Sequence, residues 1–446
     1  MASSAIDSEL FGAFFAPPAY RDIFSDRNRV QKWLDIERVL AEVQAELGMI
    51  PAAAAAEIAR HCDAAKIDLS QIGAGVAATA HPLVPALRIV EGLCADGLGE
   101  FIHYGATTQD IMDTGIVLQV KEAWPLLKGD LGACRTALAA LAGRHRATVM
   151  VGRTHGQQAL PITFGFKVAV WIDEIDRHLE RMTEAEPRLF VGNLTGAVGT
   201  MASFDGHGRR MQREVLTRLG LGTPRICWHA ARDRYGELAF LMTQISSTLA
   251  KVANQIYTLQ QIEFDELAEP HPHGKVGSST MPHKRNPALM ELTVGLGRLV
   301  RAKQVALTDA LLVEHERDVS CNQVERTSIP EMMIYVGAML THMRYCFEGL
   351  EVKPARMRAN ADLLGGLLLS ERVMLALGRH IGKQTAHEVV YEIAMQAFEA
   401  STPFKTALLA DPRVAAHLDA ETITSLLDPA DYIGEAVAIV DDVIGG

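Results

Sequence analysis

The chain has 446 residues, 48% of them hydrophobic and 22% charged, so it is a folded globular protein rather than a disordered one, and its length predicts two or three domains. A net charge of -11 gives no overall attraction for nucleic acid, although a local positive field can still bind small dicarboxylates. Aromatic residues make up only 6% of the chain while alanine and leucine are abundant, which favours helices over sheets.

The cysteines and the N-terminus indicate the cellular compartment. The 6 cysteines are scattered without a CxxC pair, as expected of free thiols in a reducing environment. The first residues include Asp7 and Glu9 where a secretory signal peptide needs lysine or arginine, and no apolar run approaches the ~18 residues of a membrane span. We therefore expect a cytoplasmic protein with no membrane partner and no nucleic-acid partner.

Residues 1–106 have the pattern of short helices separated by turns. One helical segment begins after Ser25, a good N-cap residue, and stops at Gly48 and Pro51. A new block of helical spacing follows the stretch GATTQD, which contains Thr107 and Thr108. We interpret 1–106 as an N-terminal helical domain.

Two later segments show a heptad-like apolar repeat, over residues 238–259 and, less regularly, over residues 164–182. Its members are Leu238, Met242, Ile245, Leu249, Val252, Ile256 and Leu259 in the first segment, and Phe164, Val168, Ile172, Ile175, Leu179 and Met182 in the second. The repeat predicts long helices packed against other helices, and a helix of about 30 residues spans roughly 45 Å, more than one small domain covers. We therefore predict an all-α fold with a central long-helix bundle at 107–349, completed by other subunits, and a C-terminal helical domain at 350–446.

Four polar stretches interrupt this helical pattern, and a later helix adds a fifth, EHERDVSCNQVER. The most unusual is GSSTMPHKRNP at residues 277–287, where glycine and proline break regular structure and hydroxyl, ammonium and amide donors are arranged as for a small anion. The other three interruptions are ATAHPLVPAL, FIHYGATTQD and GRTHGQQALP. The candidate functional residues are His81, His103, Thr107, Thr108, His155, Gln157, Ser278, Lys284, Asn286, Glu291, Arg317, Asn322 and Arg326.

Each stretch also has a purely structural explanation. The first two histidines can be hydrogen-bonded core residues, the two threonines can cap a helix, and the two arginines can pair with the neighbouring Glu316 and Glu325. A metal site at His271, His273 and His283 is a weaker alternative, because these residues lack ligand-like spacing. We predict no metal and no other cofactor.

Three of the stretches together resemble a known family. GSSTMPHKRNP is similar to the signature of the fumarase/aspartase superfamily, GRTHGQQALPITFG resembles its second motif, and HYGATTQD resembles its first. The resemblance extends over essentially the whole chain. It implies an all-helical homotetramer with a central twenty-helix bundle, whose active sites are each assembled from three subunits.

The resemblance also implies chemistry. Enzymes of this superfamily abstract a proton beside a carboxylate and expel a group from the neighbouring carbon, commonly leaving fumarate, and donors aimed at the developing charge supply much of the rate. By carry-over, Ser278 is the base on a mobile loop and His155 is the acid that protonates the leaving group. Glu291 matches the carboxylate that orients this histidine, and His81 matches a second histidine of adenylosuccinate lyases.

The remaining candidates are assigned to substrate binding. Lys284 and Asn286 would hold the developing dianion, with Lys284 counted among the catalytic residues. The substrate-binding set implied by the resemblance is Thr107, Thr108, Gln157, Asn286, Arg317, Arg326, His103 and Asn322. The two arginines of this set would contact the distal part of the substrate, such as a further carboxylate.

Two branches of the superfamily compete. The termini, FGAFFAPPAYRDIFSDRNRVQ and LLDPADYIGEA, look like 3-carboxy-cis,cis-muconate cycloisomerase, but that branch typically has tryptophan at the position of His155. EHERDVSCNQVER and MPHKRNP look like adenylosuccinate lyase, but Phe14 and Phe15 stand where that branch has an Arg-Tyr pair for the nucleotide phosphate, and two rings cannot replace a guanidinium. Asn322 and Ala231 also differ from that branch's phosphate-contacting serine and substrate-contacting glutamine.

These comparisons of motifs lead to a hypothesis with alternatives. We expect a fumarate-releasing carbon–nitrogen lyase that acts on a non-nucleotide N-(1,2-dicarboxyethyl) compound or a related substituted succinate, a small di- or tricarboxylate. The alternatives are the cycloisomerase, adenylosuccinate lyase, and a structural protein that keeps the scaffold without its chemistry. The intact set Ser278, Lys284, Asn286, His155 and Glu291 argues against the last alternative.

Overall fold

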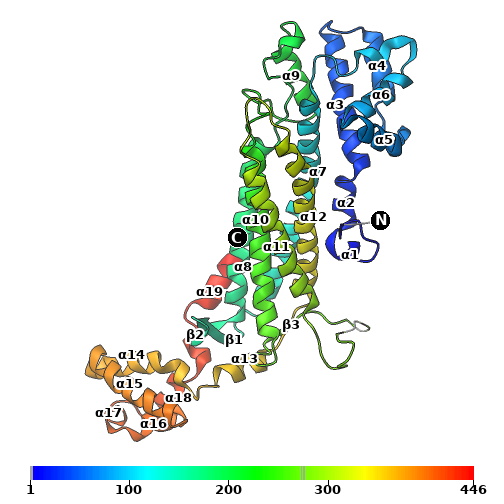
Figure 1. Cartoon of the computed structure of the whole chain (residues 1–446). Helices are drawn as coiled ribbons and strands as arrows, with labels where there is room; N and C mark the ends of the chain where they lie inside the picture. The colour runs from blue at the N-terminus through cyan, green and yellow to red at the C-terminus, as the bar shows by residue number, and fades with distance from the viewer. Residues whose placement is uncertain (1–3, 273, 275–276, 446) are drawn as a thin grey trace. The chain divides into compact units, whose positions relative to one another are not determined.

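The structure, a computed structural model, describes residues 4–272, 274 and 277–445 (Figure 1). It is 69% helical with 4% strand, which confirms the all-α prediction. The chain divides into two compact units: unit 1 comprises residues 1–131, 177–249 and 295–341, and unit 2 comprises residues 132–176, 250–294 and 342–446. Within the described residues, no helix is both long and apolar enough to cross a membrane.

Unit 1 begins with short helices, as the turn signals predict. The Ser25 side chain accepts a hydrogen bond from the Asn28 backbone N–H, and Gly48 follows the helix with a φ of 73°, a left-handed conformation that suits glycine. The helices are α1 (Gly12–Phe15), α2 (Pro18–Ile23), α3 (Asp26–Glu46), α4 (Ala52–His61), α5 (Leu69–Thr79) and α6 (Val84–Leu93).

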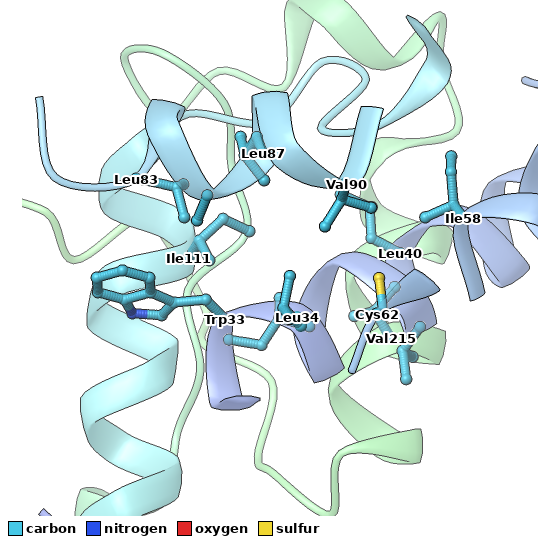
Figure 2. Packing of buried hydrophobic residues seen from close by; sticks show 14 of the residues in the cluster. Trp33, Leu34, Leu40, Ile58, Cys62, Leu83, Leu87, Val90, Ile111 and Val215 are labelled. Atoms are coloured by element: carbon cyan, nitrogen blue, oxygen red, sulfur yellow. The ribbon is translucent and has the colours of Figure 1, made fainter. Parts of the chain in front are cut away.

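A hydrophobic core joins helices α3 to α6 to the beginning of α7 (Thr108–Arg144) and to α9 (Gly208–Arg218) (Figure 2). Leu34 from α3, Leu83 beside α6, Ile111 from α7 and Val215 from α9 are all buried in it. Burying such side chains stabilises the fold by about 1.5–3 kcal/mol each. The core therefore fixes the start of α7, where two of the candidate threonines lie.

The five longest helices all lie within the predicted bundle region. They are α7 (Thr108–Arg144), α8 (Phe164–Leu189), α10 (Asp233–Gln260), α11 (Ala288–Asp309) and α12 (Ser320–Gly349). All seven apolar repeat positions of α10 are buried, and so are those of α8 except the half-buried Leu179, which confirms the periodicity. The boundary between the two units falls inside each of these helices. The three-domain division and the twenty-helix tetramer core remain predictions.

Unit 2 contains an antiparallel hairpin that the sequence did not lead us to expect, formed by β1 (Val149–Thr154) and β2 (Gln157–Thr163). A second small pairing joins β3 (Leu267–Ala268) to β4 (Glu351–Val352). The C-terminal helices α14 to α18 share a core that includes Phe404 and Leu408. The bounds of the helices after β4 are α13 (Pro354–Ala361), α14 (Ser370–Ile381), α15 (Lys383–Glu399), α16 (Phe404–Ala410), α17 (Pro412–Ala415), α18 (Ala420–Leu426) and α19 (Ala436–Gly445).

Candidate active site

In unit 1, the candidate threonines lie at the N-terminus of α7. Thr107 occupies the N-cap position, and its backbone N–H donates to Asp110 Oδ2 at 3.2 Å, as in one half of a capping box. The Thr107 hydroxyl accepts from Arg317 Nη1 at 2.9 Å, and the other Arg317 nitrogen donates to the Ala197 carbonyl. The structure therefore brings Thr107 and Arg317 together at a helix N-terminus, which favours anions.

His81 lies against the neighbouring threonine. Its Nδ1 accepts the Val84 backbone N–H at 3.1 Å, and its Nε2 lies 3.1 Å from the Thr108 hydroxyl. Because Nδ1 acts as an acceptor, the neutral ring carries its proton on Nε2, which faces Thr108. The structure thus places His81 beside Thr108, and these two contacts select one tautomer of the neutral ring.

His103 is held by a buried carboxylate. Its Nδ1 lies 2.6 Å from Glu37 Oε1, and Glu37 is fully buried. Burial by itself lowers the pKa of His103, but the charge and the hydrogen bond of Glu37 outweigh it, so the pKa lies above its ordinary value. This contact gives His103 a structural function in unit 1, and its predicted contact with substrate remains a prediction.

Asn322 also belongs to a buried polar network. Its amide donates to Glu325 Oε2 at 3.0 Å. Glu325 accepts from Arg232 at 2.7 and 2.5 Å, and Arg232 also donates to both oxygens of Asp113 at 2.8 and 2.9 Å. Glu325 is thus paired with Arg232, and not with Arg326 as the structural alternative supposed.

Arg326 instead lines a cavity of about 340 Å³, together with Arg29 and Trp33 among mostly apolar side chains. The Nε of Arg326 is buried and has no hydrogen-bond partner among the described residues. Burial and the nearby Arg29 charge lower its pKa. A cationic side chain with an unused buried donor is a suitable contact for an anionic group.

A carboxylate that sequence reasoning missed braces the start of α7. This carboxylate is Asp110, which is fully buried. Its Oδ1 accepts from the Thr195 backbone N–H and from His229 Nε2, both at 2.9 Å. Its Oδ2 accepts from the Gly196 backbone N–H at 2.9 Å. The available signal was its position three residues after Thr107, where a capping-box acid belongs.

In unit 2, His155 lies at the tip of the β1–β2 hairpin. Thr154 pairs with Gln157, so His155 and Gly156 are the two turn residues, with φ of 52° and 76°. Two positive φ angles are typical of a type I′ turn. His155 and Gln157 are therefore neighbours on an exposed tip rather than residues of a helix face.

The hairpin rests on a buried ionic network within unit 2. Arg153 donates to Glu266 at 2.6 and 3.1 Å, and the Asn360 amide donates to the same carboxylate at 2.8 Å. Gln158 in turn donates to the Asn360 carbonyl at 2.9 Å. These hydrogen bonds hold both strands next to the turn, and so they hold the turn that contains His155 in place.

The signature loop of unit 2 folds back on itself around Ser278. The Ser278 hydroxyl accepts from the backbone N–H groups of Thr280 at 3.3 Å and Met281 at 3.1 Å. A Cβ on Gly277 would lie 2.2 Å from the Lys284 carbonyl oxygen, so this close approach requires glycine. The Lys284 backbone N–H closes the next turn by donating to Met281 O at 3.0 Å.

The end of this loop is anchored to the start of α11. Gln260 donates to the Arg285 carbonyl at 3.2 Å. Glu269, which sequence reasoning also missed, accepts from the backbone N–H groups of Leu289 and Met290 at 3.1 and 3.3 Å and so caps α11. Asn286 is half-buried just before this helix, and Glu291 is exposed in its first turn.

The candidate residues are divided between the two units. Unit 1 holds His81, His103, Thr107, Thr108, Arg317, Asn322 and Arg326; unit 2 holds His155, Gln157, Ser278, Lys284, Asn286 and Glu291. Over the described part of the chain, no three His, Cys, Asp or Glu side chains are grouped as for a metal ion. His273, one of the three loop histidines, lies outside the described residues.

Comparison with known proteins identifies the family. A family model described as lyase matches residues 14–302, and one described as adenylosuccinate lyase C-terminus matches residues 366–443. The chain is 45% identical to N-acetyl-S-(2-succino)cysteine lyase from Dickeya dadantii (strain 3937), over 100% of this chain and 98% of that protein. It is 43% identical to a protein of the same name from Enterococcus italicus, over 100% of this chain and 97% of that protein.

A solved structure gives the same result. The crystal structure of 3-carboxy-cis,cis-muconate lactonizing enzyme from Pseudomonas putida matches with a TM-score of 0.92 and 35% identity, covering 98% of each chain. The resemblance to both branches is therefore confirmed, and the chain belongs to the fumarase/aspartase superfamily of lyases.

Proposed function

We propose that this lyase cleaves the carbon–sulfur bond of an S-(1,2-dicarboxyethyl) thioether by β-elimination and releases fumarate and a thiol. Identity of 45% to N-acetyl-S-(2-succino)cysteine lyase over the whole chain supports this substrate class. The observation that best supports elimination chemistry is that backbone N–H groups surround the Ser278 hydroxyl in a tight turn. An N-(1,2-dicarboxyethyl) amine, the substrate class that the motifs first indicated, is the second candidate.

Ser278 is the proposed base. The backbone N–H groups of Thr280 and Met281 point at its oxygen, and donors aimed at an oxygen favour its anion over the neutral hydroxyl. Removing the proton beside the substrate carboxylate puts negative charge on that carboxylate. In the proposal, Lys284 and Asn286 of the same loop hold this charge.

The nature of the leaving group decides how much acid catalysis is needed. A thiol has a pKa of about 8.5 and can leave as a thiolate, whereas an amine must take up a proton as it departs. His155, oriented by Glu291 in the proposal, would supply that proton. The hydrogen bonds that hold the hairpin tip in position support His155 as this acid. In the proposal, protonation by His155 is essential for an amine leaving group but only helpful for a thiol.

The cavity beside Arg326 suits the remainder of the leaving group. Its wall is mostly apolar and would accommodate an acetamido group. Arg29 is paired with Asp26 in this wall, so Arg326, whose Nε is unpartnered among the described residues, would bind the carboxylate; these are the two features that an N-acetylcysteine thiol carries. Phe15 supports this choice over a nucleotide, because its ring packs edge-on against Tyr335 with centroids 6.4 Å apart and offers no phosphate donor.

The proposal includes a homotetramer whose active sites are shared between subunits, as the family resemblance implies. Thr107, Thr108 and Gln157 would bind substrate carboxylates in such a site, and His81 would act beside Thr108. A sedimentation measurement of the purified protein tests the tetramer directly. A stable monomer with full activity would contradict this part of the proposal.

The substrate is tested with a panel of four compounds. Purified enzyme is incubated with N-acetyl-S-(2-succino)cysteine, an N-(1,2-dicarboxyethyl) amino acid, adenylosuccinate and 3-carboxy-cis,cis-muconate, and fumarate or lactone is quantified. We expect the highest kcat/KM with the thioether. Fumarate from adenylosuccinate alone, or lactone as the main product, would overturn the proposal.

The His155→Gln variant sharpens the choice between sulfur and nitrogen. On the thioether, we expect kcat to fall about tenfold, whereas any turnover of the amine should fall about 10³-fold, because only the amine requires protonation. The matched control is His387→Gln, because His387 is an exposed histidine of α15; this variant should change neither rate. Equal losses on both substrates would contradict the assigned role.

A further inference from the structure

A second cavity of unit 1, of about 800 Å³, lies beside the start of α9. Among its described lining residues are three arginines, Arg209, Arg213 and Arg225, and no acidic residue. We call this cavity the arginine pocket. Its wall also includes the half-buried Cys227, so the pocket combines positive charge with a thiol.

The thiol belongs to a chain of hydrogen-bonding groups. The Thr195 hydroxyl donates to the Cys227 sulfur at 3.1 Å. His229, whose side chain is 1% exposed, bonds to Asp110 through Nε2 at 2.9 Å, while its Nδ1 is buried without a geometric hydrogen-bond partner among the described residues. This arrangement resembles that of an activated nucleophile, in which a carboxylate (Asp110) orients an imidazole (His229) near a thiol (Cys227).

The surroundings of this group favour ionisation of the thiol. Burial opposes ionisation of Cys227, but the His229 imidazole and the hydrogen bond from Thr195 outweigh it and lower the pKa of the thiol. Burial likewise lowers the pKa of His229, but its bond to Asp110 and the neighbouring Cys227 raise it to about 9. Burial raises the pKa of Cys62, Cys94 and Cys321 instead, so these cysteines are protonated at neutral pH.

The sulfur lies on the wall of the arginine pocket. Cys227 is half-buried and lines this cavity, so a small anion in the pocket would lie next to its thiol. A Cβ on Gly199, whose φ is 86°, would lie 2.6 Å from the Cys227 Cβ and 2.9 Å from its Sγ, so only glycine fits this close approach of the backbone to the cysteine.

We propose that Cys227 is a nucleophilic thiol that adds to the double bond of a small unsaturated dicarboxylate of the fumarate class bound in the arginine pocket. The thiol gives up its proton to solvent, the sulfur lone pair forms a C–S bond to one alkene carbon, and the π electrons move to the neighbouring carbon, which takes a proton from water. The product is a 2-succino thioether on Cys227, and the step needs no oxidant or reductant. The choice of fumarate rests on the proposed function, because fumarate is a product of the proposed elimination.

Peptide mapping of the native enzyme tests this addition. After incubation with fumarate, we expect a mass increase of one fumarate on the peptide that contains Cys227, formed at least about tenfold faster than on the one that contains Cys94, because the thiolate is the reactive form. Cys94 is the internal control, since it is also half-buried but protonated. Equal modification of both cysteines, or none on Cys227, would overturn the proposal.

A second probe is independent of the proposed function. Iodoacetate is an anion and iodoacetamide is neutral, so the arginine pocket should make Cys227 prefer iodoacetate, whereas Cys94 should prefer iodoacetamide. The double variant Arg213→Gln/Arg225→Gln should lose this preference, while Arg210→Gln, an exposed arginine of α9 outside the pocket, should keep it. An unchanged preference in the double variant would contradict the pocket's role.

The adduct and the elimination activity can be measured separately, so the experiments distinguish the addition to Cys227 from the proposed lyase function. Cys227→Ser should remove the adduct and leave elimination unchanged, since Cys227 is not part of the proposed catalytic set. Failure of elimination on every substrate together with an intact iodoacetate preference would refute the proposed function and leave the anion-directed thiol standing. Normal elimination without any adduct on Cys227 would refute the addition alone.

Discussion

The start of α7 and the loop at 277–287 hold their candidate residues in opposite ways. At the start of α7, Thr107 accepts a hydrogen bond from Arg317, and the buried Asp110 ties the helix to two loop N–H groups and to His229. Residues 279–285 are exposed, and among the described residues Ser278 is held by N–H groups of its own turn. The proposed binding residues are thus fixed before substrate arrives, while the proposed base lies on a segment that rearranges at little cost.

The largest expected effect comes from removing the base. Ser278→Ala should lower kcat about 10³-fold, because it removes the group proposed to take the proton. The free energy of unfolding should change by less than about 0.5 kcal/mol, because the hydrogen bonds that the structure describes for this hydroxyl lie within one turn. Steady-state kinetics and urea unfolding measure both, with the adjacent exposed Ser279→Ala as control. A kcat within about tenfold of wild type would remove Ser278 from this role.

The brace at the start of α7 predicts a pH-dependent stability. The pKa of His229 is raised to about 9, above the ordinary value of about 6.5, so its contribution is fully present below pH ~6.5 and is lost as pH rises through about 9. The difference corresponds to about 3 kcal/mol. Urea midpoints between pH 6 and 9.5 should fall more steeply for wild type than for His229→Gln. His387→Gln, on the exposed surface of α15, should keep the wild-type slope, and parallel curves for all three would contradict the ion pair.

The loop should also be sensitive to a single methyl group. In Gly277→Ala the new Cβ would meet the Lys284 carbonyl oxygen at 2.2 Å, so the loop must shift, and kcat should fall about 100-fold through misplacement of Ser278. Thermal stability should stay close to wild type. Gly295→Ala in α11 is the matched control, since its Cβ would meet nothing within 4 Å. An unchanged kcat in Gly277→Ala would show that the loop geometry does not matter for turnover.

The sequence predicted the long helices because burial imposes a period that is visible in the residues themselves. The apolar repeat of α10, from Leu238 to Leu259, is buried throughout. The hairpin that carries His155 escaped prediction because it depends on two successive positive φ angles, which residue types indicate only weakly. The alternative pairing of Arg326 with Glu325 is absent for a simple reason, since adjacent residues on a helix do not face each other.

The braces of the candidate site were not predictable for a different physical reason. Asp110 and His229 are separated by 119 positions, and Arg232 is separated from Asp113 by the same number. Such contacts depend on how loops and helices pack, not on local sequence spacing. Motif resemblance identified the residues proposed for chemistry, whereas the residues that hold them became visible only in the structure.

The smallest expected effect tests whether fixing Arg317 in advance assists binding. Thr107→Val keeps the volume of the side chain but removes the hydroxyl that accepts from Arg317 at 2.9 Å. Losing a hydrogen bond worth about 1 kcal/mol should raise KM about fivefold and leave kcat within about twofold, because the contact serves binding rather than proton transfer. Thr107→Ser retains the hydroxyl and should restore the KM of the wild-type enzyme. Equal KM values for the two variants would mean that the hydroxyl is not what positions Arg317, and the start of α7 would then be no better prepared for substrate than the loop.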